Sequence, residues 1–441
     1  MALKSFYASS FFQALAEGLI KPFIPIFARS LGATNTLVGL ISAIPNFVNT
    51  FSQVLWGTIA DMYDRKKLMI IAGGIFWALL WLPIAFIKDP ITFLILLTVQ
   101  AFLAAISVPS WTVSLINEIP SYKRADTSAN FHTFRALGSF FGSIASGLIL
   151  NQFGFVPFVF FIICFFGLLS RAPFLFVNLR SIPVYRERLI NVLKKTFDFS
   201  NLKNQKSLVD LIKVMIILNF ATSIGGPFYS LYTIEQLGGT KLDIAIISAV
   251  GVLFSVLFYK SWGTMINRIG RKTVMLSTII PICFYPLVYA VSNNIFWLYI
   301  YSVIGHVSWA GFNLAVFTYL SDSIPSERRT YYVATYNMIT GLSLFVAPIV
   351  GGIVADITSI WHVFIISMFL RITAALFVNM LEERTGSKPR GVFNLEFDYS
   401  RIGGGLEMFI TTYSMVIYDF KDRGKKFMNI GKYVKVFVNN R

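Results

Sequence analysis

The chain has 441 residues, of which 56% are hydrophobic and only 13% are charged, and its formal net charge is +17. Soluble domains carry about 25% charged residues, so this composition excludes a soluble globular protein and indicates a polytopic membrane protein. The placement of the basic residues, described below, explains the net charge better than nucleic-acid binding does. The two cysteines, Cys164 and Cys283, lie in apolar runs and predict neither a disulfide framework nor a metal site.

Twelve apolar runs are long enough to cross a bilayer as helices, which takes about 20 residues each. They are residues 5–28, 34–58, 67–87, 91–116, 128–151, 155–179, 210–234, 240–262, 272–291, 294–320, 330–355 and 359–381. The sequence therefore predicts an all-α integral membrane protein. We divide it into a six-helix bundle at 1–179, a basic cytoplasmic linker at 180–209, a second six-helix bundle at 210–381 and a basic cytoplasmic tail at 382–441.

The lysines and arginines of the short loops gather on one side of the predicted membrane. With the N-terminus inside, the inner loops hold the basic runs at 65–67, 123–124 and 328–329, whereas the outer loops hold only Arg29, Lys88 and Lys241. Positively charged loops face the cytoplasm. Both termini are therefore expected there, in a monomeric protein of the cell membrane whose large partner is the lipid bilayer and not a nucleic acid.

Short sequences recur in the two halves at a nearly constant spacing. Residues 31–34 (LGAT) return as 237–240 (LGGT), and residues 119–124 (IPSYKR) return as 324–329 (IPSERR). Six spans in each half give both copies the same orientation. This duplication predicts two pseudosymmetric bundles around a site near the middle of the membrane.

The most informative repeat is a charged loop, at 57–67 (GTIADMYDRKK) and again at 263–272 (GTMINRIGRK). The first copy resembles the loop signature of the major facilitator superfamily, roughly G-x-x-x-D-x-x-G-R-[KR], and the second has Asn267 in place of the acid. The resemblance covers residues 1 to about 381. It implies the fold of that superfamily, with the first, fourth, seventh and tenth helices lining a central cavity.

We expect these loops to act as a conformational latch that holds the outward-open state. Cations stabilise the partial negative charge of a helix end, and an acid can accept a charge-assisted bond from an arginine. A solvated loop with positive charge on the inner side is the alternative. The residues assigned to the latch are Gly57, Asp61, Arg65, Lys66, Gly263, Asn267 and Arg271.

A weaker resemblance lies in the fifth span. Gly138, Gly142 and Gly147 resemble the antiporter signature G-x-x-x-G-P-x-x-G-G, but Ser143 stands at its proline. The fourth span has Gln100 in the region where proton-coupled drug exporters carry an arginine. The chain thus resembles a drug- or sugar-efflux member of the superfamily, and ordinary packing of small residues is the alternative for the glycines.

The first span carries charges that its repeat lacks. Gln13, Glu17 and Lys21 are four residues apart and share one helix face, and Glu17 lies about 18 Å into the span at 1.5 Å per residue. Because lipid does not tolerate such a stripe, we expect it to face an aqueous cavity. Three roles are open for Glu17, namely proton coupling, substrate binding and a structural pair with Lys21.

Arg135 in the fifth span also has no charged counterpart, since its repeat position is Thr340. It is expected to pair with Glu17, to meet an anionic substrate or to extend to the cytoplasmic surface.

Four residues of the second half are assigned to the substrate cavity together with Gln13. His306, Trp309 and Asn313 share a face of the tenth span, and Tyr229 lies in the seventh. Aromatic rings with a few polar groups suit an amphipathic small molecule. An aromatic belt at the membrane interface is the alternative.

Together these features predict a secondary active transporter of a small molecule, working by alternating access and coupled to protons. A passive facilitator of the same fold is the near alternative, and a non-transporting receptor or sensor is the distant one. The chain has no H-E-x-x-H, G-x-S-x-G or phosphate-loop motif, so we expect neither an enzyme nor a cofactor or metal. The apolar stretch 406–418 of the tail is expected to lie on the membrane surface or to be disordered.

Overall fold

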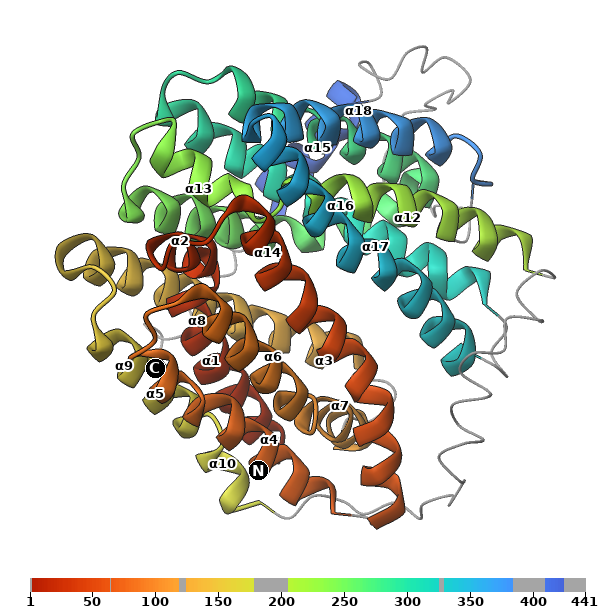
Figure 1. The fold of residues 1–441 in the computed structure, drawn as a ribbon. Helices are drawn as coiled ribbons and strands as arrows, with labels where there is room; N and C mark the ends of the chain where they lie inside the picture. Colours follow the sequence, from red (N-terminus) through yellow and green to blue (C-terminus); the bar gives the residue numbers. More distant parts are fainter. Residues whose placement is uncertain are drawn as a thin grey trace, which may run out of the picture.

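The computed structural model describes residues 2–63, 65–118, 124–177, 205–324, 329–383 and 409–423. Twelve helical segments in these ranges are long and apolar enough to cross a membrane. The prediction of twelve spans in an all-α membrane protein is thereby confirmed. The spans form two bundles that lie side by side, one from each half of the chain (Figure 1).

Four of the six spans in the first half are interrupted, close to prolines that lack the amide hydrogen a helix needs. Pro22 follows α1, and Pro83 and Pro173 lie in the short helices that end the third and sixth spans. The elements are α1 (Ala2–Ile20), η1 (Lys21–Phe23), α2 (Ile24–Ser30), α3 (Asn35–Tyr63), α4 (Lys66–Leu79), α5 (Trp81–Ile84), α6 (Pro90–Ala104), α7 (Ser107–Glu118), α8 (Arg124–Phe153), α9 (Pro157–Leu169) and α10 (Ala172–Leu175).

The second half is more regular, and only its first span is broken, at Pro227. Its elements are α12 (Lys206–Gly225), α13 (Phe228–Glu235), α14 (Lys241–Ile269), α15 (Arg271–Val291), α16 (Ile295–Ser323), α17 (Arg329–Ile357) and α18 (Ile360–Val378). Helix α12 begins inside the predicted linker 180–209, and residues 180–204 of that linker lie outside the described residues.

The two bundles repeat each other's contacts. The indole nitrogen of Trp56 donates to the carbonyl of Phe102 at 3.1 Å, and that of Trp262 donates to the carbonyl of Val307 at 2.9 Å. Each bond joins the second span of its half to the fourth. The structure therefore carries the pseudosymmetry that the sequence repeats predict.

The bundles pack most tightly against each other at one end, which we call the closed end. A β-carbon on Gly39 of α3 would collide with the carbonyl oxygen of Pro348 in α17, and one on Gly352 would collide with the carbonyl oxygen of Asn35. Glycines let the two backbones approach closely here. From this end α3 and α17 diverge toward the opposite end of the molecule (Figure 1).

The tail contains a helix, residues 409–423, that packs on the second bundle. Val416 is fully buried, and the hydroxyl of Tyr413 lies 2.5 Å from that of Ser308 in α16. The Tyr413 ring also meets the edge of Trp262, which is fully buried. This helix therefore covers a surface of α14 and α16.

Residues 409–418 of the apolar stretch 406–418 are helical, so the expectation of a disordered tail does not hold for them, and residues 406–408 lie outside the described residues. The expectation of a helix on the membrane surface stays a prediction. Tyr413 and Val416 pack on the second bundle, a contact that the sequence pattern alone does not reveal. Residues 384–408 and 424–441 of the tail lie outside the described residues.

Candidate functional site

A cavity of about 990 Å³ lies between the two bundles, and most of its wall comes from the first bundle. From the second bundle, α17 and the α12–α13 break close one side of it. The lining mixes aromatic rings with amide and hydroxyl groups. Its members include Ser42, Asn46, Phe47, Asn49, Thr50, Trp77, Trp81, Gln100, Trp111, Phe131 and Phe345.

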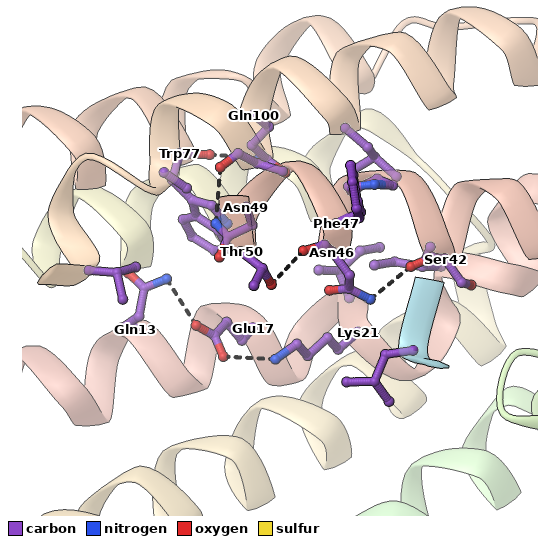
Figure 2. A pocket seen from close by; sticks show the side chains of 18 of the residues that line it. Gln13, Glu17, Lys21, Ser42, Asn46, Phe47, Asn49, Thr50, Trp77 and Gln100 are labelled. Atoms are coloured by element: carbon purple, nitrogen blue, oxygen red, sulfur yellow. Dashed lines mark hydrogen bonds and ion pairs between the residues drawn. The ribbon is translucent and has the colours of Figure 1, made fainter. Parts of the chain in front are cut away.

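The polar stripe predicted for the first span lies on this cavity. The carboxylate of Glu17 accepts from the Gln13 amide nitrogen at 3.2 Å and from the Lys21 ammonium at 3.3 Å. All three residues belong to the cavity lining, and Figure 2 shows their side chains along one edge of the pocket. The break after α1 places Lys21 in η1 without moving it off this face.

Arg135 of α8 completes the group. One of its terminal nitrogens, Nη2, lies 2.7 Å from the Glu17 carboxylate, and 39% of the Arg135 side chain is exposed. The sequence left three positions possible for Arg135. In the structure it is paired with Glu17. Because Arg135 also lines the cavity, it does not extend to the membrane surface.

Arg171, which follows α9, is a cavity residue that the sequence reasoning missed. It is 7% exposed, and its Nη2 donates to the Gln13 side-chain oxygen at 2.9 Å. Its repeat, Arg371, instead donates to the carbonyl of Ile282 at 2.7 Å within the second bundle. The sequence does contain a signal that distinguishes Arg171 from Arg371. The polar stripe of Gln13, Glu17 and Lys21 occurs only in the half that contains Arg171.

A second polar stripe, on α3, was also missed. The Asn49 amide donates to the carbonyl of Ala101 at 3.0 Å, and the Asn46 amide donates to the carbonyl of Ser42 at 2.7 Å. Figure 2 shows Asn46 and Thr50 on the side of the pocket that faces Glu17 and Lys21. The spacing of these residues at three and four positions places them on one helix face, so the sequence did contain the signal.

Tyr229, assigned to the cavity from the sequence, lies outside its lining. The Tyr229 ring stacks on Phe364 of α18 with 4.8 Å between centroids, and its hydroxyl accepts from Arg371 at 3.0 Å. This tyrosine belongs to an aromatic cluster inside the second bundle.

The three residues assigned on α16 do not line this cavity either. His306 is hydrogen-bonded to the carbonyl of Ser302 at 2.8 Å and packs against Gly251 of α14. Trp309 is half-buried in the core of the second bundle, and Asn313 is exposed. Helix α16 packs between α14 and α15. The part of the cavity wall that comes from the second bundle is formed instead by α12, the α12–α13 break and α17.

The first copy of the charged loop contacts only its own bundle in the part of the chain described. Gly57 packs next to Pro109 of α7, Arg65 is exposed, and Lys66 is buried. The side chain of Asp61 lies outside the described part.

The second loop is also joined within its bundle. Arg271 lies 3.1 Å from the carboxylate of Asp322, a pair that links α15 to α16. Asn267 is exposed, and a β-carbon on Gly263 would meet no neighbour closer than 3.8 Å. No contact between bundles through either loop is recorded among the described residues, so the latch stays a prediction.

Polar contacts join the bundles at the closed end. Arg29, which follows the first span's break, pairs with Glu235 of α13 at 2.8 Å. The carboxylate of Asp356 in α17 accepts from the backbone amides of Asn35 and Thr36 at 2.9 and 2.8 Å. These amides begin α3 and have no partner within the helix, so Asp356 satisfies them across the interface. The sequence pattern indicated only that Arg29 is an outer-loop charge.

Comparisons with known proteins agree with this architecture. Residues 1–388 match the model of the MFS_1 like family. Multidrug resistance protein MdtG of Salmonella paratyphi B (strain ATCC BAA-1250 / SPB7) is 26% identical over 285 residues, which cover 61% of this chain and 68% of the relative.

Two solved structures share the fold at low sequence identity. The nucleoside transporter NupG superposes with a TM-score of 0.70 at 15% identity, covering 86% of this chain and 99% of NupG. A POT family transporter in complex with 5-aminolevulinic acid gives 0.65 at 13% identity, covering 86% and 95%. Because the family model spans most of its length, this chain belongs to the MFS_1 like family and is a multi-pass membrane transporter of the major facilitator type.

Proposed function

We propose that the protein is a secondary active transporter that moves a small molecule across the cell membrane by alternating access, driven by protons. The observation that carries this proposal is the position of Glu17, a carboxylate on a cavity that the two bundles close at one end. A binding site closed at one end by contacts between two bundles is what one state of an alternating-access cycle requires.

The placement of basic residues suggests which side of the membrane each end faces. The basic loops and both termini lie at the end opposite to Arg29 and Glu235 in the predicted topology, and such loops face the cytoplasm. The closed end is then the outer end, both termini are cytoplasmic, and the conformation is inward-facing. The protein acts as a monomer in this proposal.

Glu17 is the proposed proton site because its charge holds side chains from two other elements. Arg135 of α8 and Lys21 of η1 both bind its carboxylate. A proton on Glu17 removes the charge that holds them and frees both cations for a new partner. The same carboxylate thereby links proton binding to the arrangement of the cavity wall.

The latch belongs to the opposite state. When the cytoplasmic end closes, the loops around Asp61 and Asn267 approach the other bundle, and their charges stabilise that outward-open state. In the inward-facing state Arg271 stays paired with Asp322 of its own bundle.

The proposal is tested with purified protein in proteoliposomes, using substrates found in a binding panel of sugars, organic acids, peptides, nucleosides and hydrophobic cations. A pH gradient should drive accumulation by the wild type. Glu17→Gln should lose accumulation, by at least tenfold, yet still exchange substrate across the membrane. Asp210→Asn, which breaks an ion pair with Lys213 outside the cavity, is the matched control. Pumping by Glu17→Gln with unchanged pH dependence would exclude Glu17 as the proton site, and gradient-independent flux in the wild type would identify a passive facilitator.

A further inference from the structure

The charges on the cavity wall do not balance. The charged side chains among the described lining residues are one carboxylate, Glu17, and three cations, Lys21, Arg135 and Arg171, which leaves two positive charges in excess. Uncompensated charge away from bulk water is costly. The cavity therefore favours an occupant that brings negative charge.

The three cations converge on one short stretch of α1. Arg135 and Lys21 share the carboxylate of Glu17, at 2.7 and 3.3 Å. One turn away the Arg171 guanidinium donates to the neutral side-chain oxygen of Gln13, at 2.9 Å. Among the described residues no carboxylate is ion-paired with Arg171, which is 7% exposed. An anion entering beside Glu17 would thus meet cations from three separate elements.

The cations that share Glu17 remain accessible. The Lys21 side chain is 68% exposed and that of Arg135 is 39% exposed, although both line the cavity. Arginine binds planar carboxylates and phosphates through paired hydrogen bonds, and lysine adds a point charge. Both are free to turn toward a ligand without leaving the cavity wall.

The rest of the wall suits a flat apolar body. The rings of Trp77, Trp111 and Phe131 line the same cavity as the cations, together with the amides of Asn46 and Gln100. Apolar and aromatic lining with a few polar groups that fix orientation is typical of small-molecule sites.

We propose that the substrate of this cavity is an organic anion, with an aromatic or other planar apolar body and a carboxylate or phosphate group that binds Arg135, Lys21 and Arg171. This inference rests on the proposed transport function and specifies its substrate class.

Proton coupling follows from the same geometry. An anion that takes Arg135 and Lys21 removes the two cations that are paired with the Glu17 carboxylate, and the third cation, Arg171, lies one turn away beside Gln13. The anion therefore binds together with a proton on Glu17, which avoids two facing negative charges. Binding of the anion should strengthen as the pH falls, and Glu17→Gln should bind it with little dependence on pH.

The test uses full-length protein and ligands that differ in charge but share a ring. Indole-3-acetate, indole-3-acetamide and tryptamine form one set, and phenyl phosphate and phenol form another. Binding is measured by isothermal titration at pH 5.5 and 7.5. In at least one set, the anion should bind at least tenfold more tightly than its neutral partner. Arg135→Gln and Arg171→Gln should each weaken that binding at least tenfold.

Two further variants keep the result interpretable. Lys213→Gln, whose lysine pairs with Asp210 outside the cavity, should leave binding unchanged. The double variant Glu17→Gln/Arg135→Gln removes one charge of each sign. It is the control for Arg135→Gln, which alone leaves Glu17 without its arginine and could impair folding for that reason. Equal or tighter binding of the neutral or cationic members, no binding by either anion, or undiminished binding in the arginine variants would overturn the proposal.

The outcomes separate this inference from the transport proposal. If the amide or the amine binds and is accumulated under a pH gradient, the transport function stands and the anion class fails. If the anion binds through Arg135 but is never moved across the membrane, the anion site stands and the transport function fails.

Discussion

At the scale of single residues, the duplication produced two arginines with different roles. Arg171 and Arg371 occupy equivalent places, but only Arg171 lines the cavity. Arg371 is 2% exposed and ties three elements together, donating to the Ile282 carbonyl at 2.7 Å and to the Tyr229 hydroxyl at 3.0 Å. Its contacts all belong to the second bundle, so its role there is structural.

We therefore expect Arg371→Gln to destabilise the protein. The shorter side chain leaves the carbonyl of Ile282 and the hydroxyl of Tyr229 unpaired, and one buried unpaired group costs about 1–3 kcal/mol. Thermal unfolding in detergent should show a lower Tm. Arg171→Gln is the matched variant and should affect ligand binding more than stability. An unchanged Tm for Arg371→Gln would mean that this arginine is not a structural tie.

At the scale of elements, the tail helix 409–423 lies outside residues 1–388, the part of the chain that matches the family model. It covers Trp262 in the second bundle, whereas Trp56, the equivalent residue of the first bundle, stays partly exposed. The helix adds apolar contacts to one bundle only. Stability of the second bundle should thus depend on it.

Val416→Ala tests this dependence. Val416 is fully buried in the core of the second bundle. Each buried carbon contributes roughly 0.8 kcal/mol, so the variant should lose about 1–2 kcal/mol of stability. Ile417, the next residue, is 44% exposed. Ile417→Ala is the control and should change the Tm less in the same melting experiment. Equal Tm values for both variants would argue against docking of this helix.

At the scale of the whole molecule, two sets of contacts at opposite ends govern the proposed alternation. Asp356 closes one end by binding the start of α3 across the interface. The loop that contains Asp61 belongs to the other end and is proposed to close it in the opposite state. Removing the Asp356 contact should favour the outward-open state, and removing the Asp61 contact should favour the inward-facing state.

Labelling of a cavity cysteine measures this bias. Asn46→Cys is placed in a background without Cys164 and Cys283, and an impermeant maleimide is added from either side. Asp356→Ala should raise labelling from the outer side several-fold, and Asp61→Asn should raise it from the cytoplasmic side. Asp89→Ala is the matched control for Asp356, because Asp89 accepts the amides that begin α6 within its own bundle. If the three variants are labelled alike from both sides, these contacts do not control access.

Sequence patterns predicted the fold well and the site in part. The stripe of Gln13, Glu17 and Lys21 was found because its four-residue spacing depends only on helix geometry. Three positions were left open for Arg135, of which the pair with Glu17 was one, and the sequence could not decide among them because the two residues lie 118 positions apart along the chain. Tyr229 and His306 were predicted to line the cavity because of the helices that carry them. In the structure those helices pack so that neither side chain lines it.

By itself the sequence determined that the protein crosses a membrane twelve times in two repeated halves, because apolar length and internal repetition are properties of the chain alone. It also determined which residues share a face of each helix. Only the tertiary structure decided that Arg171 joins Glu17 while Arg371 does not, that α17 walls the cavity, and that the tail covers α14 and α16. Those outcomes depend on how helices rotate and pack against distant neighbours, and helical periodicity carries no information about that.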